Sequence, residues 1–219
     1  MDGLTQPETP EGSAAEHRAA VEHIGIYGGT FDPPHYAHLY LADFARDALG
    51  LSKVLFVPAG DPPHKSTRST PQHRVAMLEL AIRTNPAFQI SRVDLDRPAP
   101  HYSVDMITAL RQQYPSAHFE FLIGGDSFCD LPDWRTPDQI VADRTRFVVI
   151  PRPGTESRMR ADLHDHLYPG LSRKVIILST QLINISSSHI VSELRTGHSV
   201  RYLLPDVVLD YIDQHRLYT

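Results

Sequence analysis

The sequence has little cysteine, little tryptophan and no excess of basic residues. Its single cysteine, Cys129, excludes an internal disulfide and a cysteine cluster for a metal ion, and this usage is typical of a reducing compartment. The formal net charge is -5, so no surplus of Lys and Arg is present to neutralise a long phosphate backbone. We therefore do not expect nucleic acid to be a principal ligand.

Long apolar runs are also absent. No stretch approaches the ~18 residues that a membrane-spanning helix needs, and the N-terminus lacks the basic-then-apolar pattern of a signal peptide. We therefore expect a cytoplasmic protein with no membrane partner. Residues 1–22 are polar and rich in Pro, Gly, Glu and Ala, and we expect them to form a disordered N-terminal tail because they have almost nothing to bury.

The rest of the chain has the composition of an ordinary globular protein, with 41% hydrophobic residues among 219. Short apolar runs predict strands at residues 23–27, 53–57, 88–90, 118–123, 146–150 and 174–178. Longer patterns predict helices at residues 35–49, 72–84, 138–142, 187–195 and 205–215, and one after Tyr102. This alternation predicts a single α/β domain over residues 23–219, a Rossmann-like doubly wound parallel sheet with helices on both faces. Loops that follow parallel strands open on one edge of the sheet, where ligands bind.

The segment YGGTFDPPHYAHL, residues 27–39, contains the first candidate site. Gly28 and Gly29 follow the first strand, where the lack of side chains lets backbone N–H groups approach a ligand just before a helix N-terminus. That arrangement favours a phosphate, although a plain tight turn needs glycines as often. The spacing matches neither G-x-G-x-x-G nor the P-loop, which disfavours a standard dinucleotide fold and a P-loop kinase.

Two histidines in the same segment, His35 and His38, stand three residues apart in the first turn of the predicted helix. Their rings therefore lie on one face and can reach a common group. Phosphate binding, a structural role and metal ligation all remain open at this point. No cysteine and no H-E-x-x-H helix completes a zinc set, so the metal reading is the weakest of the three.

The segment GGTFDPPHYAHL resembles the signature of the nucleotidylyltransferase superfamily. Further segments resemble, in the same order, those of the bacterial nicotinate-nucleotide adenylyltransferases. The resemblance runs from about Ile24 to Tyr218 and rests on FVPAGDPPHK at 56–65, HYSVDMI at 101–107, FLIGGDSFCDLPDW at 121–134, INISSSHIVSEL at 183–194 and YLLPDVVLDYI at 202–212.

This resemblance implies adenylyl transfer from ATP to nicotinate mononucleotide, which gives deamido-NAD and pyrophosphate. The 5'-phosphate of nicotinate mononucleotide would attack the α-phosphorus in line, without a covalent enzyme intermediate. Mg²⁺ would be carried by ATP, with no dedicated protein ligands. Phosphoryl-type transfer depends on positioning and charge stabilisation more than on a protein nucleophile, so histidines beside a glycine loop agree with this chemistry. A homo-oligomer is compatible with the sequence.

The resemblance also assigns residues. It implies that His35 and His38 are catalytic, with His38 the more important. The implied ATP-binding residues are Gly28, Gly29, Thr30, Phe31, Gly124, Asp126, Ile185, Ser186, Ser187 and Arg195. The implied residues for nicotinate mononucleotide are Thr30, Lys65, Tyr102, Ser103 and Trp134.

Ordinary roles stay open for several of these residues. Asp126 can be a turn residue, Trp134 a core-covering aromatic, and Lys65 a solvated loop lysine. A serine before a helix is commonly an N-cap, which explains one of the serines at residues 186–188.

Two positions depart from the family pattern. Val191 stands where the family has an arginine that contacts the triphosphate, and a lost charged hydrogen bond costs roughly 1.5 to 3 kcal/mol. We hypothesise that Arg195, or an arginine from residues 152–160, partly compensates. Ala37 replaces a common glycine, and its methyl group can crowd a ligand that approaches the backbone.

These departures keep alternatives open. The protein can be a nucleotide-binding sensor that kept the pocket and lost turnover, or an adenylyltransferase that acts on nicotinamide mononucleotide. Phosphopantetheine adenylyltransferases and cytidylyltransferases share the histidine signature, but they are usually shorter and lack the Trp134 loop.

Overall fold

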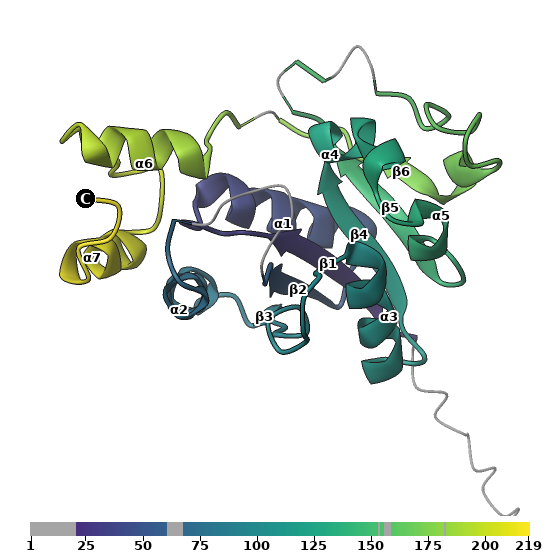
Figure 1. Ribbon diagram of the computed structural model, residues 1–219, viewed down its shortest axis with the longest axis horizontal. Helices are drawn as coiled ribbons and strands as arrows, with labels where there is room; N and C mark the ends of the chain where they lie inside the picture. The colour runs from purple at the N-terminus through teal and green to yellow at the C-terminus, as the bar shows by residue number, and fades with distance from the viewer. Residues whose placement is uncertain (1–20, 61–67, 153, 156–158, 182) are drawn as a thin grey trace, which may run out of the picture.

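The computed structural model describes residues 21–60, 68–152, 154–155, 159–181 and 183–219. Within these residues, the strands form one parallel sheet with the order β3-β2-β1-β4-β5-β6 (Figure 1). The strands are β1 (His23–Gly29), β2 (Lys53–Pro58), β3 (Phe88–Ile90), β4 (His118–Gly124), β5 (Thr145–Ile150) and β6 (Val175–Ile177). The predicted fold class is therefore confirmed.

The helices cover both faces of this sheet. They are α1 (Tyr36–Leu49), α2 (Pro71–Ile82), α3 (Ser103–Gln113), α4 (Gly125–Cys129), α5 (Pro137–Ile140), α6 (Ser187–Arg195) and α7 (Asp206–Gln214), with short 3-10 helices η1 (Leu131–Asp133) and η3 (Leu171–Lys174). Buried side chains of α1, α2, α6 and α7 form one core with Val54 and Phe56 of β2, whereas those of α3, α4 and α5 form a second core with Leu55 and Val57. Alternate residues of a strand point to opposite faces, so the two cores lie on opposite sides of the sheet.

The direction of chain winding reverses between β1 and β4. From β1 the chain moves outward to β2 and β3, and it then crosses back to β4, β5 and β6 on the other side of β1. The helices that follow β1 and β4 therefore diverge to opposite faces. In open parallel sheets such a reversal point leaves a crevice at the carboxyl ends of the strands, which is the usual ligand position.

Most predicted elements are confirmed with end shifts of one or two residues. The clearest error concerns residues 124–137, where the sequence predicts neither a helix nor a strand but the structure contains α4 and η1. These two elements have only five and three residues, too short to give a periodic signal. The helix predicted at residues 138–142 is also shorter and begins earlier, at Pro137. The predicted tail, residues 1–22, lies outside the described residues apart from its last two.

A buried carboxylate, that of Asp32, ties the loop after β1 to two other segments. It accepts hydrogen bonds from the backbone N–H groups of Arg68 (2.5 Å) and Ser69 (3.2 Å) and from the Ser69 hydroxyl (2.6 Å). The hydroxyl of Tyr218, 186 residues away, donates to it at 2.5 Å. Burial and this hydrogen bond raise the pKa of Tyr218 above its ordinary value, so the hydroxyl stays a donor.

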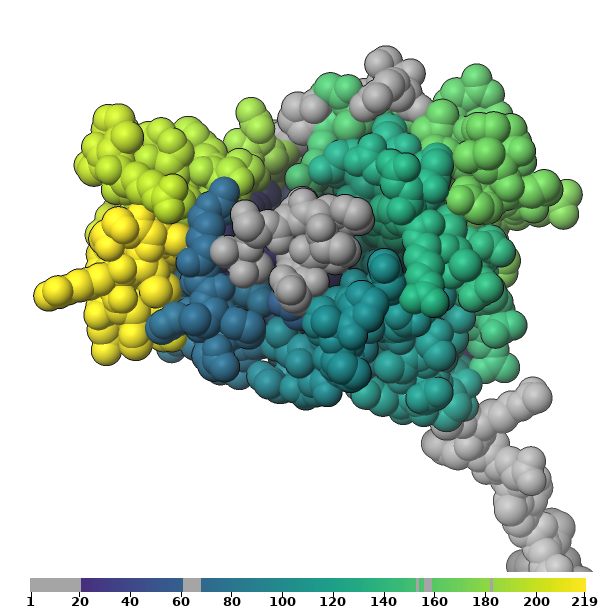
Figure 2. Space-filling view, viewed as in Figure 1, coloured from purple at the N-terminus to yellow at the C-terminus, as the bar shows by residue number. Residues whose placement is uncertain are grey.

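The C-terminal helices are held next to the first half of the sheet by such contacts. Figure 1 places α6 and α7 at the end of the molecule away from α5 and β6, and Figure 2 shows α7, in yellow, against the blue surface of α2. Tyr218 follows α7 and is 7% exposed. Its hydroxyl therefore connects the end of the chain to the loop between β1 and α1.

We expect Tyr218→Phe to lower the free energy of unfolding by about 2 kcal/mol, because it removes a hydrogen bond to a buried charge. Tyr202→Phe is a matched control, since Tyr202 is 80% exposed and both tyrosines have a positive φ (71° for Tyr202 and 66° for Tyr218). Urea unfolding of both variants measures the difference. Equal unfolding midpoints would contradict the role of Asp32 described above.

Candidate functional site

The carboxyl ends of β1 and β4 bring the predicted glycines to one edge of the sheet. Gly28 and Gly29 end β1, and Gly124 ends β4. A Cβ atom on Gly124 would lie 2.7 Å from the Nε atom of Arg152 and would also meet the Asp126 carboxylate. Without a Cβ atom, Gly124 lets these two half-exposed side chains approach the backbone closely, and any other residue here would make them shift.

The loop after β1 presents the two histidines. Phe31 has a left-handed backbone (φ 50°) and is 1% exposed, and its ring meets the edge of the His38 ring at 5.0 Å between centroids. His35 is the N-cap residue of α1, and its ring stacks on that of His38 with 3.6 Å between centroids and 17° between planes. The spacing of three residues thus places both rings on one face, as predicted.

Hydrogen bonding determines the tautomer of His38. Its Nδ1 atom accepts the backbone N–H of His35 at 3.3 Å, so in the neutral ring the proton resides on Nε2. Burial, and secondly the nearby charge of Arg152, lower the pKa of His35 to about 4. His35 is therefore neutral at pH 7 in the protein without ligands.

Arg152 lies two residues after the end of β5 and contributes positive charge to this edge of the sheet. Its Nε atom lies 3.5 Å from Oδ1 of Asp126, and both side chains are about half exposed. From the sequence, the arginines of residues 152–160 were candidates only as a group. The rule that loops after parallel strands share one edge would have selected Arg152, because it stands closest to the strand end.

The serines before α6 have different partners. Ser186, which follows the half-buried Ile185, is the N-cap residue, and its Oγ atom accepts the N–H of His189 at 3.2 Å. The hydroxyl of Ser187 donates to the Pro33 carbonyl oxygen at 2.9 Å, which places the N-terminus of α6 against the histidine loop. Capping therefore explains Ser186, while Ser187 connects two parts of the site.

A further arginine, Arg68, lies at the same helix end. Its Nη2 atom donates to the Ser188 hydroxyl at 3.1 Å, and its backbone N–H is held by Asp32. Arg68 is not recognisable as a site residue in the sequence, because 120 residues separate it from Ser188. No local pattern marks such a contact.

The two departures from the family pattern are both buried. Val191 is 2% exposed and Ala37 is 4% exposed, so both side chains belong to the protein interior. Arg195 is exposed at the last position of α6, and its Nε atom donates to the carbonyl oxygen of Tyr218 at 3.4 Å. Eight residues separate Arg195 from Ser187, which is about 12 Å along a helix axis. The structure thus places Arg195 away from the N-terminus of α6.

A second group of predicted residues lies on the other face of the sheet. Tyr102 is the N-cap residue of α3 and Ser103 its first residue, both half-buried. Trp134 packs on Phe121 and Phe147, with 6.3 Å and 6.4 Å between centroids, and remains partly exposed. Its neighbour Arg135 lies over the Tyr102 ring, which joins the two segments. Lys65 lies outside the described residues.

Thr30 is also held by an arginine from α2. Arg74, which is 0% exposed, donates to the carbonyl oxygens of Thr30 at 3.0 Å and Gly60 at 3.2 Å. It thereby fixes the ends of the loops after β1 and β2 relative to each other. The sequence does not mark Arg74 as a buried residue, since an arginine in an amphipathic helix is usually exposed.

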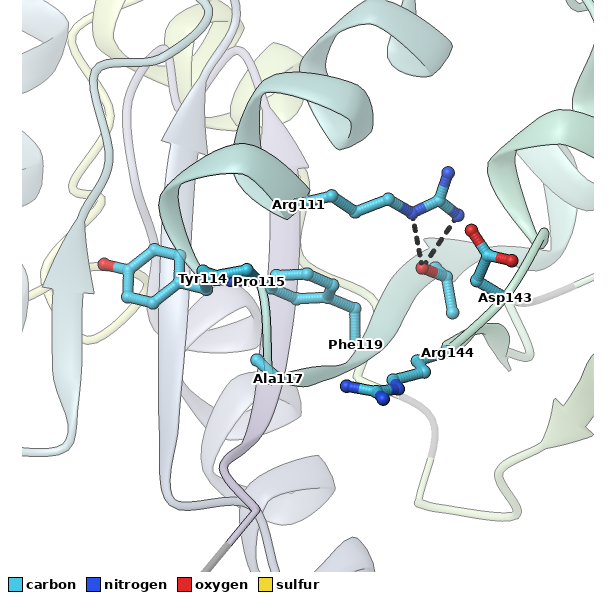
Figure 3. A pocket seen from close by; sticks show the side chains of 8 residues that line it. Arg111, Tyr114, Pro115, Ala117, Phe119, Asp143 and Arg144 are labelled. Carbon is cyan, nitrogen blue, oxygen red and sulfur yellow. Dashed lines mark hydrogen bonds between the residues drawn. The ribbon is translucent and has the colours of Figure 1, made fainter. Parts of the chain in front are cut away.

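A cavity of about 320 Å³ lies at the opposite edge of the sheet, near the amino ends of β4 and β5 (Figure 3). Arg111, which lines it, donates to the carbonyl oxygens of Ile140 and Ala142, both at 2.7 Å, and to the hydroxyl of Thr145. These contacts fasten α3 to the segment after α5. The arginine therefore has a structural role, and this cavity is separate from the residues discussed above.

The described residues contain neither a metal-binding cluster nor a membrane-spanning helix. No group of three His, Cys, Asp or Glu residues in this part of the chain is arranged to hold a metal ion. None of its helices has the length and apolar character needed to cross a membrane.

Comparison with known proteins gives consistent matches. Residues 26–193 match the family model described as cytidylyltransferase-like. A protein of Thermomicrobium roseum named "Probable nicotinate-nucleotide adenylyltransferase" is 45% identical over 197 residues, covering 89% of this chain and 91% of that protein. A protein of the same name from Salinibacter ruber is 38% identical over 197 residues, covering 89% and 97%.

Solved structures agree on the fold. A structure described as Plasmodium falciparum nicotinic acid mononucleotide adenylyltransferase complexed with NaAD has a TM-score of 0.72 at 22% identity, covering 90% of this chain and 97% of that one. A second structure of the same protein, complexed with APC, has a TM-score of 0.69 at 21% identity, covering 90% and 97%. At this identity the likeness concerns the arrangement of the strands and helices.

The depressed pKa of His35 predicts a loss of stability in mild acid. The folded protein keeps His35 neutral down to about pH 4, whereas an unfolded histidine binds a proton below about pH 6.5. The unfolded state therefore gains protons first as the pH falls, and this group lowers the free energy of unfolding by about 3 kcal/mol between pH 6.5 and 4.

We expect His35→Asn to show a shallower pH dependence of the free energy of unfolding across that window, measured by urea unfolding without nucleotide. His166→Asn is the control, since it removes a histidine that is exposed. Parallel pH profiles for His35→Asn and the parent would contradict the assignment.

Proposed function

Since the chain belongs to the cytidylyltransferase-like family and, within it, to the nicotinate-nucleotide adenylyltransferases, we propose that it transfers the adenylyl group of ATP to nicotinate mononucleotide. The products are deamido-NAD and pyrophosphate, a step of NAD biosynthesis. The observation that carries this proposal is the stacked pair His35 and His38, held beside the glycine end of β1 and next to the N-terminus of α6.

The reaction exchanges one phosphoanhydride bond for another. An oxygen of the nicotinate mononucleotide phosphate forms a bond to the α-phosphorus of ATP, and the bond between that phosphorus and the bridging oxygen of the β-phosphate breaks. The leaving pyrophosphate carries the electron pair of the broken bond. Negative charge builds up on the leaving side, so the protein contributes by positioning and by electrostatic stabilisation.

The histidine loop supplies donors for this charge. With Nδ1 of His38 accepting the His35 N–H, the protonated Nε2 atom can donate to a phosphate oxygen. The first backbone N–H groups of α6 and the guanidinium of Arg152 add positive potential at the same edge. The Mg²⁺ that accompanies ATP neutralises phosphate charge, and we assign no protein ligand to it.

The substrates occupy the two sides of the β1–β4 crevice in this proposal. The triphosphate lies along Gly28 to Phe31 and the start of α6, and the adenosine lies by Gly124 and Asp126. The pyridine nucleotide lies on the α3 side by Tyr102, Ser103 and Trp134, and Thr30 stands between the reacting phosphates. Lys65 is assigned to this substrate by family resemblance alone. A cytoplasmic location and a homo-oligomer stay predictions.

The sensor alternative is not favoured. Its basis is Val191 and Ala37, whose side chains are both buried in the protein interior, and the relatives that the chain matches are named adenylyltransferases. The preference between nicotinate and nicotinamide mononucleotide depends on the residues around the pyridine ring, on the side of Tyr102, Ser103 and Trp134.

We expect the purified protein to release pyrophosphate from ATP and Mg²⁺ when nicotinate mononucleotide is present. His38→Ala should lower kcat about 100-fold or more, because it removes a donor to the developing charge. The exposed His166→Ala is the control and should keep the parent rate. No release with either pyridine mononucleotide, together with measurable ATP binding, would overturn the proposed function.

We also propose that Arg68 supplies the triphosphate contact that Val191 cannot make. Arg68→Ala should raise the KM for ATP about tenfold, since one charge-assisted hydrogen bond is lost. Arg195→Ala should have a smaller effect, because Arg195 stands at the far end of α6. Steady-state kinetics of both, with the exposed Arg83→Ala as a charge-matched control, decide between them. A larger effect from Arg195→Ala would assign the contact to Arg195.

A further inference from the structure

Arg135 connects the two segments that form the pyridine side of the site. Its guanidinium carbon lies 4.9 Å from the centre of the Tyr102 ring, at the start of α3. Its chain neighbour Trp134 packs on Phe121 and Phe147 from β4 and β5. A cation–π contact attracts the guanidinium without supplying an oxygen acceptor, so its N–H groups can still donate to a ligand.

The charge of Arg135 is not neutralised by a carboxylate of the described residues. No ion pair involves Arg135 among the residues that the structure describes. The other arginine near Tyr102, Arg97, has its guanidinium occupied by Asp94 at 2.5 Å and by the carbonyl oxygens of Pro100 (3.1 Å) and Tyr102 (3.0 Å). Of these two cations, only Arg135 is available for an anion from solution.

The backbone next to Arg135 is strained. Thr136 has φ 44° and ψ 59°, a left-handed conformation that β-branched residues rarely adopt. Strained residues persist where the surrounding structure holds them, and they are concentrated at ligand sites. The conformation of Thr136 sets the direction in which the chain leaves Trp134 and Arg135 before α5 begins at Pro137.

We propose that Arg135 determines the preference for nicotinate over nicotinamide mononucleotide by pairing with the carboxylate on the pyridine ring. This inference rests on the proposed function and deepens it. The nicotinate carboxylate is a planar anion that a guanidinium binds with two parallel hydrogen bonds, whereas the nicotinamide carboxamide is neutral. In this proposal the pyridine ring stacks on Trp134, and its carboxylate faces the guanidinium of Arg135, the next residue in the chain. The amide leaves the guanidinium without its counter-charge, so the amide substrate is disfavoured.

The test is the ratio of kcat/KM for the two mononucleotides in Arg135→Gln. We expect kcat/KM for nicotinate mononucleotide to fall roughly ten- to a hundredfold, with little change for nicotinamide mononucleotide. The preference ratio should therefore collapse by the same factor. Arg135→Lys keeps the charge but loses the bidentate geometry, and it should retain part of the preference. Arg173→Gln, at an exposed position, is the charge-matched control.

Binding without ATP gives a second readout. Trp134 is the only tryptophan of the chain, so quenching of its fluorescence reports a ring stacked on it. We expect Arg135→Gln to raise the Kd for nicotinate mononucleotide and to leave the Kd for nicotinamide mononucleotide nearly unchanged.

The outcomes separate the two proposals. Turnover of nicotinate mononucleotide by the parent, with an unchanged preference ratio in Arg135→Gln, would overturn the role of Arg135 and keep the proposed function. An equal loss for both substrates would likewise overturn it, since that result indicates a structural role. No turnover of either substrate by the parent would overturn both proposals.

Discussion

The buried carboxylate of Asp32 is the contact on which the arrangement of the site depends. A carboxylate that is 2% exposed is costly to bury unless donors surround it, and here four donor groups from residues 68, 69 and 218 do so. These donors come from the segment before α2 and from the end of the chain. By collecting them, Asp32 fixes the loop that leads from β1 into α1.

By fixing this loop, Asp32 also determines the positions of His35 and His38. The loop fixed by Asp32 ends at His35, where α1 begins, and the backbone N–H of His35 sets the tautomer of His38. The Arg74 side chain, from α2, also holds this loop by donating a hydrogen bond to the Thr30 carbonyl oxygen. The histidine pair is therefore positioned by groups that need not touch a ligand themselves. Such preorganisation is what a reaction without a protein nucleophile requires.

Charge is distributed unevenly around this pair. Both rings stack in a partly buried place where burial and Arg152 keep His35 neutral, while the cations stand around them rather than within the stack. In the proposed reaction, the negative charge of the bound triphosphate would balance the positive charge of these surrounding cations. On α6, the side chain of Val191 belongs to the core, and the positive charge near the start of the helix comes from another segment, through the contact of Arg68 with Ser188.

The sequence by itself determined the strands and the longer helices in their order along the chain. It also determined the edge of the sheet at which the glycines lie and the common face of His35 and His38. These are local properties, since they follow from hydrophobic periodicity, strand direction and a spacing of three residues. Only the tertiary structure decided that Tyr218 meets Asp32, that Arg68 meets Ser188 and that Arg135 covers Tyr102. Each of these pairs joins segments brought together by the crossing connections of the sheet, at separations in sequence where no periodicity carries information. The short helix α4 also escaped prediction, because its five residues are held by packing against β4 and β5 rather than by helix propensity.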